Sequence, residues 1–144
     1  MQHYEDNFAH NSLPISDLQP EYTFVDLPQF QHPEMLNCVA KLLDNHIKEG
    51  RGENVCIRTF ESTWNYFDLY KKANQIAHVL VDEFGLKSGN RVLLRSANNP
   101  MMVACWFAVL KAGGIVVATM PLLRAKELTT IIDCAEISHL LSDK

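Results

Sequence analysis

The stretch Asn98–Leu123, which reads NNPMMVACWFAVLKAGGIVVATMPLL, determines the fold that this sequence predicts. Asn99 can accept a backbone N–H of a first helical turn, and Pro100 suits the first helical position, where its missing N–H costs nothing. The residues from Met101 to Leu110 are almost all apolar. They predict a helix that is hidden on most of its circumference.

A diglycine and a β-branched run follow this helix. Gly113–Gly114 can adopt the left-handed backbone that ends a helix, and Ile115–Ala118 predicts a strand buried on both faces. Val92, Leu93 and Leu94, in the segment Arg91–Arg95, predict a buried strand before the helix. After it, an amphipathic helix, Ala125–Ala135, precedes a third strand, His139–Leu141. The order strand, helix, strand, helix, strand with short links is typical of an α/β protein with a doubly wound parallel sheet.

The residues before this unit predict a helix, a small β-hairpin and a second helix. The first helix covers residues 37–50. The strands Val55–Arg58 and Thr63–Asn65 are joined by a tight connection, as in a hairpin. Asn65 can also cap the second helix, which Gly85 ends. The apolar side chains of this helix share one face and are predicted to be buried: Leu69, Ala73, Ile76, Ala77, Leu80 and Phe84.

The N-terminal residues differ in composition from the rest of the chain. Residues 1–33 hold four of the six prolines and show no sustained hydrophobic periodicity. Aromatic side chains are scattered among them: Tyr4, Phe8, Tyr22, Phe24 and Phe30. We therefore predict an extended N-terminal arm over residues 1–35, which lies on a surface or is partly disordered, and a domain over residues 36–144.

The composition excludes several classes of protein. The formal net charge is −4 and no basic cluster exceeds two adjacent residues, so we expect no nucleic-acid partner. The first twenty residues are too polar for a secretory signal, and the longest uncharged window, Ser96–Leu110, is too short to span a membrane. The widely spaced cysteines are predicted to be free thiols in a reducing, cytoplasmic setting: Cys38, Cys56, Cys105 and Cys134.

A search for complete catalytic motifs finds none. No GxxxxGK[ST] or GxGxxG pattern is present, and the six histidines lack metal-ligand spacing, so no metal site is predicted. Arg124 and Lys126 follow a strand end, where they either meet a phosphate or form a charged turn facing water. Large side chains of the central helix either line an acyl pocket or pack in the core: Met101, Met102, Trp106 and Phe107.

Several segments resemble the adenylate-forming enzymes. Leu110–Leu123 (LKAGGIVVATMPLL) is similar to a signature of that superfamily, and Thr63–Leu69 (TWNYFDL) resembles its earlier motif, which opens a long helix. The segments GLKSGNRVLL and NNPMMVACWFAVLKAGG match it as well. Leu36–Ile47 (LNCVAKLLDNHI) is similar to the opening helix of acyl-CoA synthetases, particularly the aryl-CoA and aminobenzoate-CoA ligase branch. The resemblance implies that residues 36–144 are an incomplete, N-terminal portion of a larger AMP-binding domain.

The resemblance also implies an activity, that of an ATP-dependent carboxylate–CoA ligase. Such an enzyme forms an acyl-adenylate from a carboxylic acid and Mg-ATP, and coenzyme A then displaces AMP. The family's catalytic residues are expected beyond Lys144, so none is expected in this chain. The isolated chain is therefore expected to be inactive and to bind none of ATP, Mg and coenzyme A tightly. By resemblance, Met120, Leu123 and Arg124 lie near the coenzyme A nucleotide.

A second hypothesis comes from a different class of protein. The chain would then be a free-standing α/β binding or interaction module without ligase activity. Tight nucleotide binding by the 144-residue chain would favour this module. If the chain is instead a fragment of a larger domain, the sheet edge and helix faces that the missing chain would cover predict self-association of the fragment.

Overall fold

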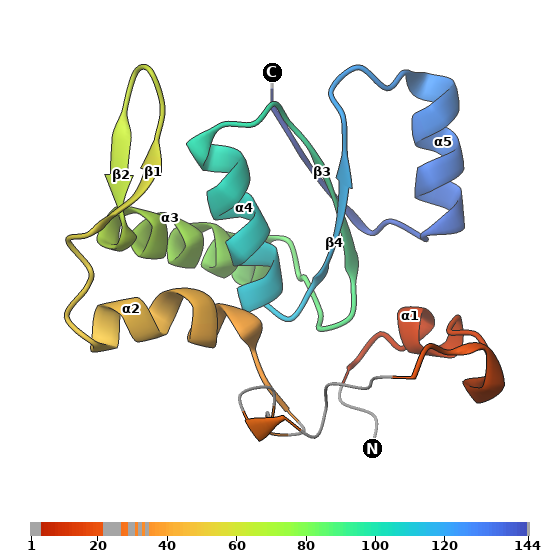
Figure 1. The fold of residues 1–144 in the computed structure, drawn as a ribbon. Coiled ribbons are helices and arrows are strands. Elements are labelled where there is room, and N and C mark those ends of the chain that lie inside the picture. Colours follow the sequence, from red (N-terminus) through yellow and green to blue (C-terminus); the bar gives the residue numbers. More distant parts are fainter. Residues whose placement is uncertain (1–3, 22–26, 29–30, 32, 34, 144) are drawn as a thin grey trace.

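The computed structural model describes residues 4–21, 27–28, 31, 33 and 35–143 (Figure 1). The helices are α1 (Phe8–Asn11), α2 (Asn45–Lys48), α3 (Tyr66–His78), α4 (Pro100–Lys111) and α5 (Ala125–Cys134). The strands are β1 (Val55–Arg58), β2 (Thr63–Asn65), β3 (Arg91–Arg95), β4 (Ile115–Thr119) and β5 (His139–Ser142). A 3₁₀ turn, η1 (Ser16–Leu18), and two π-helical segments, η3 (Ala40–Asp44) and η4 (Val79–Glu83), complete the order.

The principal sheet has three parallel strands in the order β4-β3-β5. Its register pairs Leu93 with Val117 on one side and with Leu140 on the other. Helices α4 and α5 lie on opposite sides of this sheet (Figure 1). Strands β1 and β2 form a separate antiparallel hairpin. The predicted α/β fold, a partial doubly wound sheet preceded by a helix and a hairpin, is confirmed.

Helix α4 is shared by two hydrophobic clusters. One cluster joins it to α3 and to the segment that includes η3: Val39, Leu43, Leu69, Ala73 and Ala104. The other joins it to β3 and η4: Leu80, Leu86, Val92, Leu94 and Val109. The small residues Ala104 and Ala108 are fully buried, which lets neighbouring elements approach the α4 backbone closely.

Local capping signals explain where the long helices begin. The Asn99 side chain accepts the Met102 N–H at 2.8 Å, as predicted for the start of α4. At α3, the Asp68 N–H donates to Asn65 Oδ1 at 2.9 Å and the Asn65 N–H donates to Asp68 Oδ2 at 3.0 Å. Both helix starts are therefore determined by residues three positions apart, which explains why they could be read from the sequence.

Outside α4, the predicted burial of β4 and of Phe84 was wrong. The structure leaves Ile115–Val117 half-buried and Ala118 exposed, because β4 pairs with β3 alone among the described strands. Phe84 was assigned to the buried helix face, yet 64% of it is exposed. Its N–H donates to the Val79 carbonyl, five residues earlier, at 3.2 Å. This wider π-helical turn rotates Phe84 away from the face that an α-helical period predicts.

Helix α4 is also less enclosed than predicted. Met101 and Trp106 are 43% and 42% exposed, so one side of the helix faces solvent among the described residues. The helix is buried only on the side of Ala104, Ala108 and Val109.

The described part of the predicted N-terminal arm is not uniformly extended, because it includes α1 and η1. Residues 4–8 contact the turn that precedes β3. Three of the aromatic residues of the predicted arm lie outside the described residues: Tyr22, Phe24 and Phe30. The boundary between residues 35 and 36 stays a prediction.

Candidate functional site

The carboxyl ends of the three parallel strands meet at one edge of the sheet. Ser96 follows β3, Met120 follows β4 and Asp143 follows β5, and α4 begins at the same edge with Pro100. Open α/β sheets bind their ligands outside this edge, because loops from several strands converge there. This edge is therefore the candidate functional site.

A hydrogen-bonded network around Asp143 holds this edge together. Its Oδ2 accepts from Asn99 Nδ2 at 2.9 Å and from Ser96 Oγ at 3.4 Å. The Asn99 amide also donates to Ser96 Oγ at 3.3 Å. The backbone N–H of Asp143 donates to the Arg95 carbonyl at 3.0 Å. The network joins the ends of β3 and β5 to the start of α4.

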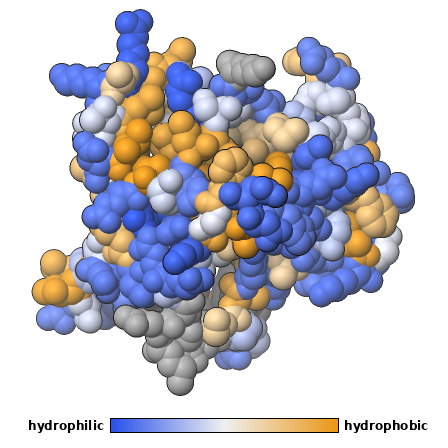
Figure 2. All heavy atoms as spheres, turned by 180° about the vertical axis from the view of Figure 1, so that it is seen from behind, coloured by the Kyte–Doolittle hydropathy of each residue, from blue (hydrophilic) through white to orange (hydrophobic). Residues whose placement is uncertain are grey.

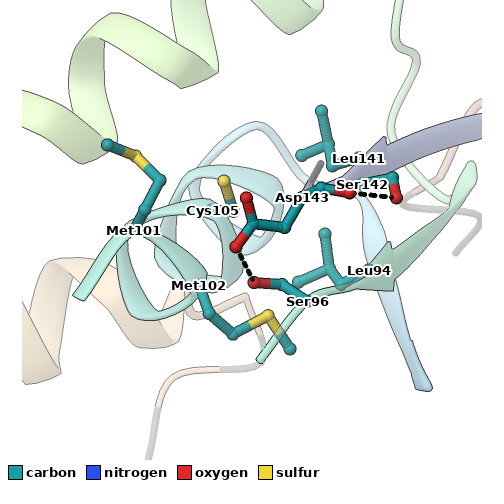
Figure 3. Close-up of a pocket in the computed structure, with 8 residues that line it drawn as sticks. All are labelled: Leu94, Ser96, Met101, Met102, Cys105, Leu141, Ser142 and Asp143. Carbon is teal, nitrogen blue, oxygen red and sulfur yellow. Dashed lines mark hydrogen bonds between the residues drawn. The ribbon is translucent and has the colours of Figure 1, made fainter. Parts of the chain in front are cut away.

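A pocket of about 170 Å³ opens beside this network (Figure 3). Its lining combines apolar and sulfur-bearing side chains with a few polar groups: Leu94, Ser96, Met101, Met102, Cys105, Leu141, Ser142 and Asp143. Burial raises the pKa of the Cys105 thiol, so this side chain stays protonated at neutral pH. A thiol is a poor nucleophile compared with a thiolate. The pocket therefore offers apolar contact and hydrogen bonds, and its thiol is not activated as a nucleophile.

The large side chains of α4 were expected either to line an acyl pocket or to pack in the core. In the structure some of them contact the core and some line clefts. Met102 packs partly against the cluster at the sheet, and Phe107 packs partly against the cluster at α3. Met102 and Trp106 also line two clefts of about 570 and 380 Å³ on the outer side of α4. Met102 therefore packs partly against the core and also lines both clefts, and an acyl pocket at these side chains stays a prediction.

The loop after β4 carries the three residues assigned by resemblance to coenzyme A. Met120 is 62% exposed and lines the 570 Å³ cleft, whereas Leu123 and Arg124 are not among the residues that line it. The Leu123 N–H donates to the Met120 carbonyl at 3.2 Å, and the Arg124 N–H donates to Glu127 Oε2 at 3.1 Å. Arg124 is exposed, as is Lys126 in the same turn. Their contact with coenzyme A stays a prediction.

Arg95 is a site residue that the sequence analysis treated only as the end of a strand. Its guanidinium donates through Nη2 to the Pro121 carbonyl and so ties the loop after β4 to β3. The available signal was its position, because an arginine that closes an apolar strand lies at the edge where ligands bind. Its partner could not be inferred, since Pro121 is 26 residues further along the chain.

The described residues show neither a cluster of metal ligands nor a helix suited to span a membrane. Within the described ranges, no group of three or more His, Cys, Asp or Glu side chains is arranged to hold a metal ion. None of the helices in these ranges combines the length and the apolar character needed to cross a membrane.

Known proteins with similar sequences and structures narrow the function. The chain is 31% identical over 77 residues to the uncharacterized acyl–CoA ligase YtcI of Bacillus subtilis, and the match covers 54% of this chain and 14% of that protein. An anthranilate CoA ligase in complex with anthranoyl-AMP superposes with a TM-score of 0.70 at 23% identity, over 76% of this chain and 20% of that one. ATP-bound MatB from Rhodopseudomonas palustris superposes with a TM-score of 0.66 at 27% identity, over 72% and 20%.

The matches cover most of this chain but only a small part of the similar proteins. The chain spans no more than 16% of the length of curated relatives that it matches. Most of this chain is nevertheless matched, because the AMP-binding enzyme family aligns with residues 43–144. This range includes α3 and all three strands of the parallel sheet, so the match follows the fold and not one short motif. The chain therefore belongs to the AMP-binding enzyme family.

Proposed function

We propose that residues 36–144 form the N-terminal portion of the adenylate-forming domain of an ATP-dependent carboxylate–CoA ligase. The match of residues 43–144 to AMP-binding enzymes carries the proposal. The similar proteins support it, since they include an acyl–CoA ligase, a ligase holding anthranoyl-AMP and an ATP-bound enzyme. The proposed substrate is an aryl or acyl carboxylic acid.

The proposed reaction has two steps. A carboxylate oxygen attacks the α-phosphorus of ATP, and pyrophosphate leaves; the sulfur of coenzyme A then attacks the acyl carbon, and AMP leaves. The first step depends on positioning and on neutralising the phosphate charge. Among the described residues no group of three or more His, Cys, Asp or Glu side chains gathers at one place, and we assign no step to the metal. We propose that the catalytic residues lie outside this chain, beyond Lys144.

The test of this function begins with the gene past the codon for Lys144. We expect a following Ser/Thr/Gly-rich loop with a lysine, and an encoded full-length protein that releases pyrophosphate from ATP only when a carboxylic acid is present. The 144-residue chain alone is expected to release none. A full-length protein inactive on a panel of aryl and acyl acids would contradict the proposal. Tight ATP binding by the 144-residue chain in calorimetry would favour a free-standing binding module.

We propose that Arg124, with Met120 and Leu123, contacts the nucleotide part of coenzyme A. In the full-length protein, Arg124→Ala is expected to raise KM for coenzyme A about tenfold, because a hydrogen bond to a charged group contributes roughly 1.5–3 kcal/mol. Pyrophosphate release without coenzyme A should not change. Arg58→Ala removes another exposed arginine, on β1, and serves as the control. An unchanged KM for coenzyme A in Arg124→Ala would remove this residue from the site.

We also propose that the 144-residue chain self-associates with a second copy through the β5 edge. Among the described strands β5 pairs with β3 alone, and Leu140 on it is 56% exposed. Seen from behind, apolar side chains gather in one area of the surface (Figure 2). Light scattering should detect a dimer that Leu140→Lys weakens, since a charge at a strand edge opposes pairing. A strictly monomeric chain at high concentration would contradict this.

We propose that the protein is located in the cytoplasm, and its cysteines support this proposal. All four are free thiols in the structure. Free thiols persist where glutathione and thioredoxin keep cysteines reduced.

A further inference from the structure

Arg91, the first residue of β3, carries a guanidinium that is almost entirely buried, with 5% of the residue exposed. Its Nε donates to the Ala135 carbonyl and its Nη2 to the Glu136 carbonyl, both at 2.8 Å. Its Nη1 donates to the Gly89 carbonyl at 3.1 Å and also forms an ion pair with Asp6. A buried charge is tolerated only when it is paired and its donors are satisfied. Arg91 therefore connects the end of α5 to the N-terminal segment.

The N-terminal segment, residues 4–8, is held by the turn that precedes β3. The Asp6 N–H donates to the Ser88 carbonyl at 2.9 Å, and the Glu5 N–H donates to Ser88 Oγ at 3.1 Å. At Gly89, which has a φ of +87°, an added Cβ would lie 2.0 Å from the Asp6 carbonyl oxygen. The segment thus lies directly against the backbone of this turn.

The Asp6 carboxylate has three donors. They are the backbone N–H of Phe8 at 3.0 Å, Asn90 Nδ2 at 2.9 Å, and Arg91. The hydrogen bond from Phe8, followed by those from Arg91 and Asn90, holds the pKa of Asp6 below its ordinary value of 3.8 despite the opposing effect of burial. The Phe8 ring lies 4.5 Å from the guanidinium carbon of Arg91, which adds a cation–π contact.

We propose that residues 4–8 form a clasp that positions α5, and with it the loop that leads into this helix. The two arginines that bracket β3 are the structural basis. Arg91 holds the carbonyls at the C-terminal end of α5, and Arg95 holds the Pro121 carbonyl in the loop before it. The clasp supplies Arg91 with its closest carboxylate partner. Asp6 and Arg91 are then positioning residues for Arg124, and this last link rests on the proposed function.

Loss of the clasp has a defined consequence at the link between α5 and β5. Glu136 has a φ of +45°, a left-handed backbone that a non-glycine residue adopts at a cost. Arg91 stabilises it through the Glu136 carbonyl and through a looser ion pair with the exposed Glu136 carboxylate at 3.6 Å. The next amides, of Ile137 and Ser138, donate to the carbonyls of Ile132 and Arg91, each at 3.0 Å. Hydrogen exchange at these two amides reports whether the segment between α5 and β5 keeps its hydrogen bonds.

The experiment compares Asp6→Asn with Glu5→Gln in the full-length protein, since each removes one N-terminal carboxylate and only that of Asp6 pairs with Arg91. Hydrogen exchange at Ile137 and Ser138 is expected to rise about tenfold in Asp6→Asn alone, because a charge-assisted hydrogen bond is lost. KM for coenzyme A should rise about threefold, because the lost hydrogen bond acts on Arg124 only through α5, and adenylation should be unchanged. Phe8→Leu, which removes the ring under Arg91, should show the same pattern more weakly.

Three outcomes would overturn the inference. Unchanged exchange at Ile137 and Ser138 in both Asp6→Asn and Phe8→Leu would refute the clasp. Equal acceleration throughout β3 would mean that Asp6 stabilises the whole fold without positioning α5. Faster exchange at the two amides with an unchanged KM for coenzyme A would remove the link to Arg124. Absence of any ligase activity would refute the proposed function instead, and the exchange data would still decide whether the clasp exists.

Discussion

Replacement of Gly89 by alanine is expected to release residues 4–8 and to lower the free energy of unfolding by about 3 kcal/mol. Two effects add. A left-handed backbone costs an L-residue about 1–2 kcal/mol, and each hydrogen bond lost with the segment costs about 1 kcal/mol. The new Cβ would lie 2.0 Å from the Asp6 carbonyl oxygen, so the segment must move away. Urea unfolding and hydrogen exchange measure the two consequences.

Gly85→Ala is the matched control for this substitution. Gly85 has a φ of +64°, but an added Cβ would meet no atom within 4 Å. The control therefore carries the backbone cost without the collision, and Gly89→Ala should be less stable than it by about 1–2 kcal/mol. Equal destabilisation of the two variants would show that residues 4–8 contribute nothing to stability at this turn.

The second large effect is expected at the centre of the sheet. Leu93→Ala should lower the free energy of unfolding by about 2–5 kcal/mol, because removing this core side chain leaves a cavity. Leu93 is 1% exposed, in the strand with neighbours on both sides. Thermal or urea unfolding measures the loss.

Leu140→Ala provides the comparison, because Leu140 is the register partner of Leu93 on β5. The two side chains point to the same side of the sheet, yet Leu140 is 56% exposed. Its truncation should cost about 1 kcal/mol or less, since little apolar surface leaves the core. If both variants lost the same stability in the 144-residue chain, then β5 would be covered in solution, as self-association predicts.

From residue 37 onward the sequence was sufficient to predict the helices and strands, and it was sufficient for the family. Asn99 with Pro100 and Asn65 with Asp68 start α4 and α3, and these signals act over three residues or fewer. The order of elements then implied a parallel doubly wound sheet, because short links between alternating strands and helices leave few other arrangements. The resemblance seen in Leu110–Leu123 and its neighbours agrees with the match of residues 43–144 to AMP-binding enzymes.

Burial and the candidate site depended on more distant partners. Apolar strands predict burial, but only the strand order β4-β3-β5 decides that β3 has two neighbours and β4 has one. Phe84 left its predicted face because the π-helical turn closes its hydrogen bond over five residues in place of the four of an α-helix.

From residue 37 onward, the sequence by itself determined which segments become helices and strands, because capping and hydrophobic periodicity act between near neighbours. Tertiary structure alone decided the roles of the two arginines of β3. Asp6 is 85 residues from Arg91, and Pro121 is 26 residues from Arg95. The buried guanidinium of Arg91 has its partners where the fold brings oxygen atoms to it, and no local spacing records those positions.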